Sequence, residues 1–214
     1  MDGRRQFTVR VISLGTNNEP EDLITGTSGN IVWSSDSDHF FYVKKDPITL
    51  IANSVYLHRI GTSQEKDKLI FEEKDQEFDI SISRSASTEY ILINSESTDS
   101  NEYYFVNLSK PEATPRLFLK RKAKHLYYLE HYENSFYLRS NLDAPNFKLL
   151  AADDDKEFRE DVFEEIVPHR KDTYLKDFLV TRNFFITEVY KGGLPAVAVR
   201  AKGKAEDSRE GAQS

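Results

Sequence analysis

Phe40-Phe41-Tyr42-Val43 is a short apolar run whose counterpart returns three times along the chain. The later copies are Tyr90-Ile91-Leu92-Ile93, Phe136-Tyr137-Leu138-Arg139 and Phe184-Phe185-Ile186-Thr187. Successive copies start 50, 46 and 48 residues apart. A period in this range is typical of repeat architectures in which each repeat is one supersecondary unit. The fold is therefore expected to consist of stacked repeats.

Each copy has the same kind of neighbours. A strand-like run precedes every copy, at Asn30–Trp33, Phe78–Ile82, His125–Leu129 and Tyr174–Phe178. Another follows it, at Val55–His58, Tyr103–Val106, Phe147–Leu150 and Val197–Val199. A fourth run closes the first three repeats, at Leu69–Phe71, Arg116–Leu119 and Glu165–Val167. Short runs rich in Val, Ile, Phe and Tyr and bounded by turn formers indicate β-strands.

The second run of each repeat is continuously apolar rather than alternating, which is typical of a strand covered on both faces. Four antiparallel strands in each repeat of 46 to 50 residues indicate a β-propeller blade, because stacked blades cover each other's sheets. The sequence therefore predicts an all-β fold: a partial, open propeller of about four blades, each a four-stranded antiparallel sheet.

The two ends of the chain differ from the repeats. Thr8–Leu14 resembles the third strand of a blade that lacks its first two strands, and Asp22–Thr25 would be its outer strand. Gly26–Gly29 is then expected to form a turn between blades. The predicted organisation is a flexible N-terminus at residues 1–7, a partial propeller at 8–201 and a disordered tail at 202–214, which has no aromatic or β-branched residue.

Composition excludes several classes of protein. The 214 residues carry a net charge of −7, which argues against a general nucleic-acid binder. No apolar stretch approaches the ~18 residues that span a membrane. Basic residues near Met1 are not followed by an apolar segment, so no secretory signal is expected. The absence of cysteine suits a reducing compartment, and a cytoplasmic location is predicted.

Several segments together resemble a known propeller, that of the oligopeptidase B (protease II) group in the prolyl oligopeptidase family of serine peptidases. They are Gly29–Trp33, Phe41–Pro47, Tyr56–Thr62, Glu72–Asp75, Phe136–Asn141 and Ala144–Phe147. The resemblance runs from about Val9 to Arg200. Each segment alone is a weak signal, but their ordered series is specific.

The resemblance implies a seven-bladed propeller that caps an α/β-hydrolase domain with Ser, Asp and His and admits only short or unfolded peptides. This sequence contains no Gly-x-Ser-x-Gly nucleophile elbow and no β/α alternation. About three blades and the hydrolase domain have no counterpart in it. We therefore expect the chain not to be catalytic by itself.

Residue types that often form functional sites are present, but structural roles account for them. The histidines are expected to be structural or surface residues: His39, His58, His125, His131 and His169. The carboxylate runs Glu72–Glu77 and Ala152–Glu157 are expected to be solvated inter-blade loops. The basic run Lys120–His125 could be a nuclear signal or a polyanion patch, but it is expected to be a freely varying surface loop. Tyrosines that could form a peptide-binding face are expected to be half-buried blade residues whose hydroxyls reach water: Tyr103, Tyr104, Tyr127, Tyr128 and Tyr132.

Accordingly, no catalytic, cofactor-binding or metal-binding residue is nominated, and no cofactor is expected. The predicted partners are the α/β-hydrolase peptidase domain of a parent enzyme, the peptides that enter it, and a second copy of the chain through open blade faces. Nucleic acid and membrane are not expected partners. The alternatives left open are a standalone propeller scaffold for protein interactions and a non-functional truncated gene product.

Overall fold

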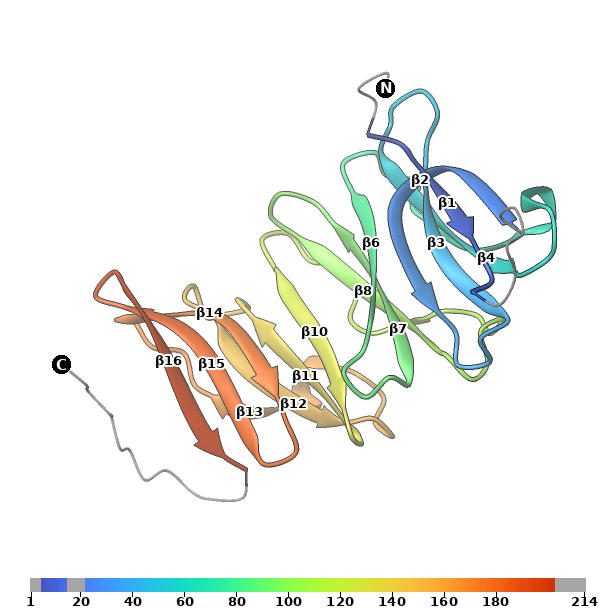
Figure 1. Ribbon diagram of the computed structural model, residues 1–214. Helices are drawn as coiled ribbons and strands as arrows, with labels where there is room; N and C mark the ends of the chain where they lie inside the picture. Colours follow the sequence, from blue (N-terminus) through green and yellow to red (C-terminus); the bar gives the residue numbers. More distant parts are fainter. Residues whose placement is uncertain (1–4, 15–21, 203–214) are drawn as a thin grey trace.

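The computed structural model describes residues 5–14 and 22–202. Over these residues the chain forms β-strands joined by turns, with two short 3-10 helices, η1 (Gln64–Lys66) and η2 (Glu160–Val162). No helix among them has the length and apolar character needed to cross a membrane. Four antiparallel sheets follow one another along a curved row that does not close, with β1 near one end and β16 at the other (Figure 1). The predicted all-β, open, partial propeller is confirmed.

Strands that are consecutive in the chain are neighbours in every sheet. The first sheet contains β1 (Phe7–Val11), β2 (Asp22–Trp33), β3 (His39–Lys45), β4 (Ala52–Arg59) and β5 (Lys68–Glu72). The second contains β6 (Asp79–Arg84), β7 (Tyr90–Glu96), β8 (Asn101–Asn107) and β9 (Arg116–Leu117). The third contains β10 (Tyr127–Tyr132), β11 (Ser135–Ser140), β12 (Lys148–Asp153) and β13 (Glu164–Val167). The fourth contains β14 (Thr173–Val180), β15 (Phe184–Lys191) and β16 (Leu194–Ala201). We call these sheets blades 1 to 4.

The repeated apolar runs are the second strands of blades 2 to 4, as predicted, and the third strand of the five-stranded blade 1. In β3, β7 and β11 most side chains are buried, including adjacent residues that point to opposite faces. In β15 only Thr187 is buried. This difference follows from position, because β15 belongs to the last blade of the row and has a neighbouring blade on one face only.

The first blade contains one correction to the sequence prediction. Gly26–Gly29 lies inside the continuous strand β2 and is not a turn between blades. The first part of β2 pairs with β1 and the last part with β3, and the register shifts between Thr27 and Ile31. Gly26 and Gly29 have φ of 70° and 85°, values that glycine adopts without steric cost. The glycines therefore bend the strand without ending it, as in a β-bulge.

The β1–β2 hairpin, predicted to be the remnant of a preceding blade, is continuous with blade 1, because β1 to β5 form one five-stranded sheet. Ile24 on β2 is fully buried against Phe40 and Tyr42 of blade 1, and Val9 of β1 packs on the same cluster. β1 begins at Phe7 and β16 ends at Ala201. Of the segments predicted to be flexible or disordered, residues 1–4 and 203–214 lie outside the described residues.

Apolar clusters fill the spaces between consecutive blades. Val43 of blade 1 packs with Ile80 and Ile91 of blade 2. Phe105 of blade 2 packs with Phe136 of blade 3, and their ring centroids are 5.1 Å apart. Tyr137 of blade 3 packs with blade 4 in a third cluster. The core is therefore a series of inter-blade layers, and each blade depends on its neighbours for burial.

We expect Phe136→Ala to destabilise the protein by about 3–5 kcal/mol, because it empties a fully buried site that contacts two blades. Urea unfolding followed by circular dichroism measures this change, with Phe136→Leu as a milder substitution. Ile48→Ala is the control, since Ile48 is 89% exposed in a turn. Equal effects of Phe136→Ala and Ile48→Ala would contradict the inter-blade core.

Candidate functional site

Amide side chains join consecutive blades in place of strand pairing, and that of Asn101 is fully buried. The Oδ1 atom of Asn30 in β2 accepts the backbone N–H of Ile82 in β6 at 2.7 Å. Asn101 at the start of β8 bonds Tyr127 of β10 twice: Asn101 Nδ2 donates to the Tyr127 carbonyl at 2.7 Å, and Asn101 Oδ1 accepts the Tyr127 N–H at 3.0 Å. The amide thus imitates a paired strand and fixes blade 3 against blade 2.

The hydroxyl of Tyr127 is buried as well, which corrects the expectation that the tyrosine hydroxyls reach water. It donates to the Leu119 carbonyl and accepts the Tyr103 N–H, each at 2.9 Å. Burial raises the pKa of Tyr127 and of Tyr103 well above the usual range. At physiological pH both side chains are neutral, so they serve as hydrogen-bonding groups inside the junction.

Arg121, which lies between β9 and β10, forms ion pairs with two carboxylates from earlier parts of the chain. Its Nη2 atom pairs with Glu73, just after β5, and with Glu102 in β8. The guanidinium also lies 3.8 Å from the centroid of the Phe78 ring. Burial acts to raise the pKa of Glu73, but the Ser95 hydroxyl, a backbone N–H and the Arg121 charge together hold it below its usual value. This ion cluster joins the segment after blade 1 and strand β8 of blade 2 to the segment that leads from blade 2 to blade 3.

The Arg121 cluster corrects two expectations. The run Lys120–His125 contains Arg121, which two carboxylates hold in place, so it is not a freely varying surface loop. The run Glu72–Glu77 contains a buried carboxylate at Glu73. Sequence could not show this pairing, because Glu73 and Arg121 are 48 positions apart and come from runs of opposite charge.

His131 in β10 forms a second polar junction between blades 2 and 3. Its Nδ1 atom lies 2.7 Å from Ser87 Oγ and its Nε2 atom 3.4 Å from Asp154 Oδ2. The Ser87 N–H also donates to the His131 carbonyl at 2.9 Å. Burial lowers the pKa of His131 although Asp154 acts to raise it, so the imidazole is neutral at physiological pH. The three side chains have the composition of a hydrolase triad, but Ser87 contacts the opposite ring nitrogen from a serine-peptidase nucleophile.

His58 in β4 joins the β1–β2 hairpin to blade 1. Its Nδ1–H donates to Asp67 Oδ1 at 2.7 Å, and its Nε2 atom lies 3.5 Å from Asp22 Oδ1. Asp67 also accepts the Tyr42 hydroxyl at 2.8 Å. Burial, together with the Asp67 charge, raises the pKa of Tyr42 well above its usual range. The imidazole and both carboxylates are almost fully buried. This set of residues, which we call the His58 cluster, holds β2 against β4.

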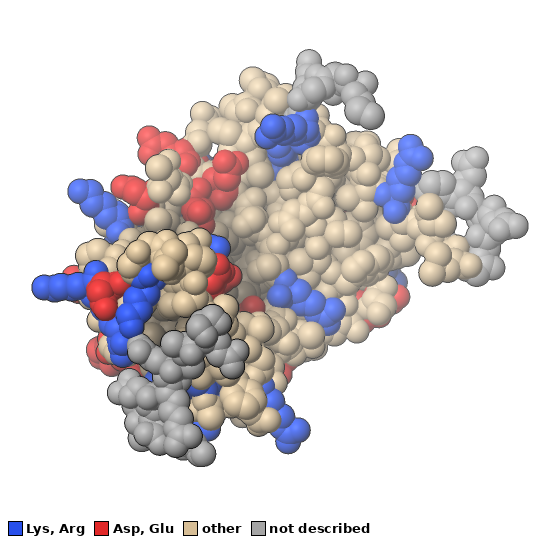
Figure 2. Space-filling view, turned by 60° about the vertical axis from the view of Figure 1, so that its left-hand side comes forward, with Lys and Arg blue, Asp and Glu red and all other residues tan. Residues whose placement is uncertain are grey.

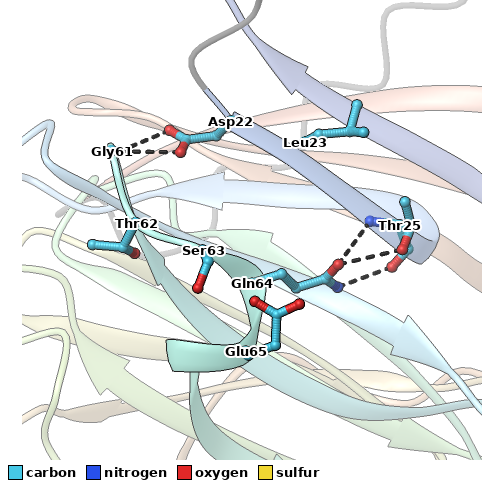
Figure 3. Close-up of a pocket in the computed structure, with 8 residues that line it drawn as sticks. All are labelled: Asp22, Leu23, Thr25, Gly61, Thr62, Ser63, Gln64 and Glu65. Carbon is cyan, nitrogen blue, oxygen red and sulfur yellow. Dashed lines mark hydrogen bonds between the residues drawn. The ribbon is translucent and has the colours of Figure 1, made fainter.

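An open groove of about 520 Å³ lies beside the His58 cluster, between β2 and the loop that leads to η1 (Figure 3). Both carboxylate oxygens of Asp22 accept the Gly61 N–H, at 2.9 and 3.1 Å. The Gln64 amide bonds the backbone N–H and carbonyl of Thr25 at 3.1 and 3.0 Å. Figure 3 shows these polar groups turned toward one another across the groove. Because they satisfy each other, the groove is a junction between elements.

Blades 3 and 4 are joined by Arg139 in β11. Its guanidinium carbon lies 4.2 Å from the Tyr128 ring centroid and 4.3 Å from that of Phe147. Its Nη1 atom donates to the Leu175 carbonyl in β14 at 2.9 Å. The guanidinium thus lies near two aromatic rings, an arrangement in which a cation is attracted to the ring faces, and it is largely removed from water.

The remaining histidines do not form a catalytic or metal centre. His39 pairs with Asp36 at 2.9 Å on the surface. His125 Nε2 lies 2.9 Å from Ser140 Oγ, and burial lowers the pKa of His125. Among the described residues, no three His, Cys, Asp or Glu side chains are grouped so that they could hold a metal ion.

Charge is not segregated by sign on the face shown in Figure 2. Acidic and basic side chains are intermixed at one side of this view, and a broad area carries few charges. A surface of mixed sign does not provide the continuous basic track that a nucleic-acid backbone requires.

Comparison with known proteins identifies the architecture. Residues 1–211 match the family model for the N-terminal β-propeller domain of prolyl oligopeptidase. The chain belongs to this propeller family. The resemblance noted in the sequence is therefore confirmed.

Full-length relatives of this propeller are much longer than the chain. It is 34% identical to dipeptidyl aminopeptidase BI of Pseudoxanthomonas mexicana over 92% of this chain and 27% of the relative. It is 31% identical to protease 2 of Moraxella lacunata over 70% of this chain and 22% of the relative. The structure of oligopeptidase B from Leishmania major matches with a TM-score of 0.86 and 26% identity, over 93% of this chain and 28% of that chain. The chain thus spans about a quarter of the length of these relatives.

We expect Arg121→Ala to destabilise the propeller by about 2–4 kcal/mol, because it leaves Glu73 and Glu102 buried without their shared counter-charge. The expected loss is below the maximum for a buried pair, since a quarter of the Arg121 side chain is exposed. Lys120→Ala, in the same basic run, should change stability by less than ~0.5 kcal/mol. Urea unfolding of both variants measures the difference. A loss that is equal in the two variants would show that the cluster contributes nothing.

We expect acid to weaken the His131 junction. Because the folded-state pKa of His131 is lowered, its contribution to stability is fully present above the usual histidine pKa of ~6.5 and is lost as pH falls through the folded value. Urea midpoints measured from pH 7.5 to 5 should therefore fall, and His131→Gln should reduce that fall. His39→Gln serves as the control outside the junctions. The same pH dependence in wild type and His131→Gln would rule out this role for the imidazole.

Proposed function

We propose that this chain is the blade-forming part of a substrate gate in an oligopeptidase B-like serine peptidase, where it packs on an α/β-hydrolase peptidase domain. By itself it is not catalytic. The observation that carries this proposal is the match of residues 1–211 to the N-terminal propeller domain of prolyl oligopeptidase. The match to oligopeptidase B over 28% of that chain supports the same assignment.

The geometry is compatible with a gate because each pair of neighbouring blades is fixed by directional polar contacts. Hydrogen bonds from Asn101 and Asn30 and the ion cluster of Arg121 set the position of one blade against the next. Apolar packing alone would allow blades to slide, since it has no direction. A rigid ring segment can exclude folded proteins while short peptides pass.

The partners that follow from this function are the peptidase domain and the peptides that reach it. We also propose a cytoplasmic location, which the lack of cysteine suits. Neither nucleic acid nor membrane is a partner in this proposal.

The chain alone should not hydrolyse a fluorogenic peptide with Arg or Lys before the scissile bond. The measurement is release of the fluorophore with and without a serine-directed covalent inhibitor. Inhibitor-sensitive hydrolysis that co-purifies with the chain would contradict the proposal.

The gating role is tested in a chimera. Residues 5–202 of this chain replace the aligned segment of dipeptidyl aminopeptidase BI, and hydrolysis of a short peptide is compared with that of a folded protein. We expect the chimera to cleave the short peptide and spare the folded protein, whereas the relative without its propeller segment cleaves both. A soluble chimera that cleaves both substrates equally would refute gating by this chain.

A further inference from the structure

A lysine side chain lies among aromatic rings where blades 3 and 4 meet. Lys202 directly follows β16. Its Nζ atom is 4.7 Å from the ring centroid of Tyr132, 5.6 Å from that of Tyr137 and 5.4 Å from that of Phe185. The two tyrosines belong to blade 3 and the phenylalanine to blade 4. We call these three residues the aromatic cage.

The strand register directs the Lys202 side chain into the cage. Arg200 of β16 pairs with Phe185 of β15, and residues two positions apart in a strand point to the same face. The Lys202 N–H donates to the Asn183 carbonyl at 2.8 Å, which keeps its backbone in line with β16. Lys202 therefore shares with Arg200 and Phe185 the face of blade 4 that is turned toward blade 3. Arg200 reaches blade 3 as well, since its Nη1 atom donates to the Ile166 carbonyl at 2.6 Å.

A carboxylate lies at the open side of the cage. Glu133, in the turn between β10 and β11, has its Oε2 atom 3.8 Å from the Nζ atom of Lys202. The Glu133 side chain is 56% exposed and that of Lys202 19%, so the cage is open to water where Glu133 lies. The negative faces of aromatic rings and a nearby carboxylate both attract a cation. The site therefore favours a positively charged group over a neutral apolar one.

The spacing of the rings fits a methylated ammonium group. A methyl carbon lies ~1.5 Å from its nitrogen and contacts ring atoms at ~3.5–4.0 Å, which places the nitrogen ~5–5.5 Å from a ring face. The distances from Lys202 Nζ to the three ring centroids, 4.7, 5.4 and 5.6 Å, are close to this range. A primary ammonium is strongly hydrated, so entry into an aromatic site costs it more hydration than it costs a methylated one.

Other lysines that lie over rings have a simpler arrangement. Lys44 Nζ is 5.3 Å from the Tyr56 ring centroid, and Lys176 Nζ is 5.6 Å from that of Tyr190. Within the described part of the chain, each of these two ammonium groups lies over one ring, whereas that of Lys202 lies near three. One ring at an exposed site attracts a cation weakly. Lys44 is therefore a matched control for Lys202.

We propose that the aromatic cage is a binding site for methylated ammonium groups and that Lys202 occupies it as a built-in competitor. The Lys202 side chain can leave by rotation about its own bonds while its backbone stays bonded to Asn183. The group recognised is a quaternary ammonium, carried by a free small molecule such as choline or by a methylated lysine in a peptide. This inference goes beyond the proposed peptidase role, and its readout is binding rather than activity.

Titration of the full chain with choline, followed by NMR of the aromatic ring signals, tests the proposal. Lys202→Gln removes the competing ammonium and should bind choline with a Kd of ~1–10 mM. Wild type should bind at least ~3-fold more weakly, because the tethered lysine competes. Lys44→Gln, the control with one ring, should match wild type, and circular dichroism checks that both variants are folded. Absence of saturable binding by Lys202→Gln overturns the proposal, as does equal binding by Lys202→Gln and wild type.

The neutral isostere of choline, in which a carbon atom replaces the nitrogen, distinguishes a cation site from an apolar cleft. We expect Lys202→Gln to bind this isostere at least ~10-fold more weakly than choline, because the isostere lacks the charge that the rings and Glu133 attract. The double variant Lys202→Gln/Phe185→Leu keeps an apolar wall but loses one ring, and should bind choline ~5-fold more weakly than Lys202→Gln. Equal binding of choline and its isostere overturns the proposal.

Two ligands distinguish the sources of the ammonium group. Choline and a short peptide that contains trimethyllysine are titrated into Lys202→Gln under the same conditions. Tighter binding of the peptide assigns the cage to methylated lysine, and tighter binding of choline assigns it to a free small molecule. Either result supports the cage, whereas binding of neither ligand overturns it.

Discussion

A β-sheet with apolar side chains on both faces must be covered on both faces, and this requirement governs the whole molecule. β3, β7 and β11 are buried on both sides by neighbouring blades. Each blade is a single sheet, so it cannot cover the two faces of its own inner strand. Stability therefore resides in the layers between blades, such as the Phe105–Phe136 layer, rather than within any one sheet. The stability of the whole row therefore depends on the packing between its blades.

Polar contacts between blades add a directional constraint that apolar packing does not provide. Hydrophobic burial holds two sheets together but tolerates rotation and sliding, whereas a hydrogen bond has a length and a direction. Asn101 meets both backbone groups of Tyr127 and so permits one register of blade 3 against blade 2. His131 acts at the same pair of blades, whereas Arg121 joins the segment after blade 1 to blade 2. Removing one member of such a cluster leaves the others buried without a partner. A buried polar group without a partner lowers the free energy of unfolding, so a single substitution in such a cluster is destabilising.

The strands and their order could be predicted from sequence because they depend on local patterns. The apolar runs at Phe40–Val43 and Tyr90–Ile93 predict that their side chains are buried and that another sheet covers each face of the strand. The junctions could not be predicted in this way. Ser87 and His131 are 44 positions apart, and each is an ordinary polar residue in its own segment. The glycines at 26 and 29 predict a turn, and this prediction is wrong because two glycines signal a change of direction but not whether strand pairing continues through it.

The junctions also bear on how a propeller segment could act as a gate. Glu73, Glu102 and Arg121 come from three successive blade regions, so a displacement of one blade disturbs the contacts of two others. We therefore expect the displacement of one blade to cost the polar contacts of its neighbours. This coupling between blades suits the proposed role of the segment as a gate.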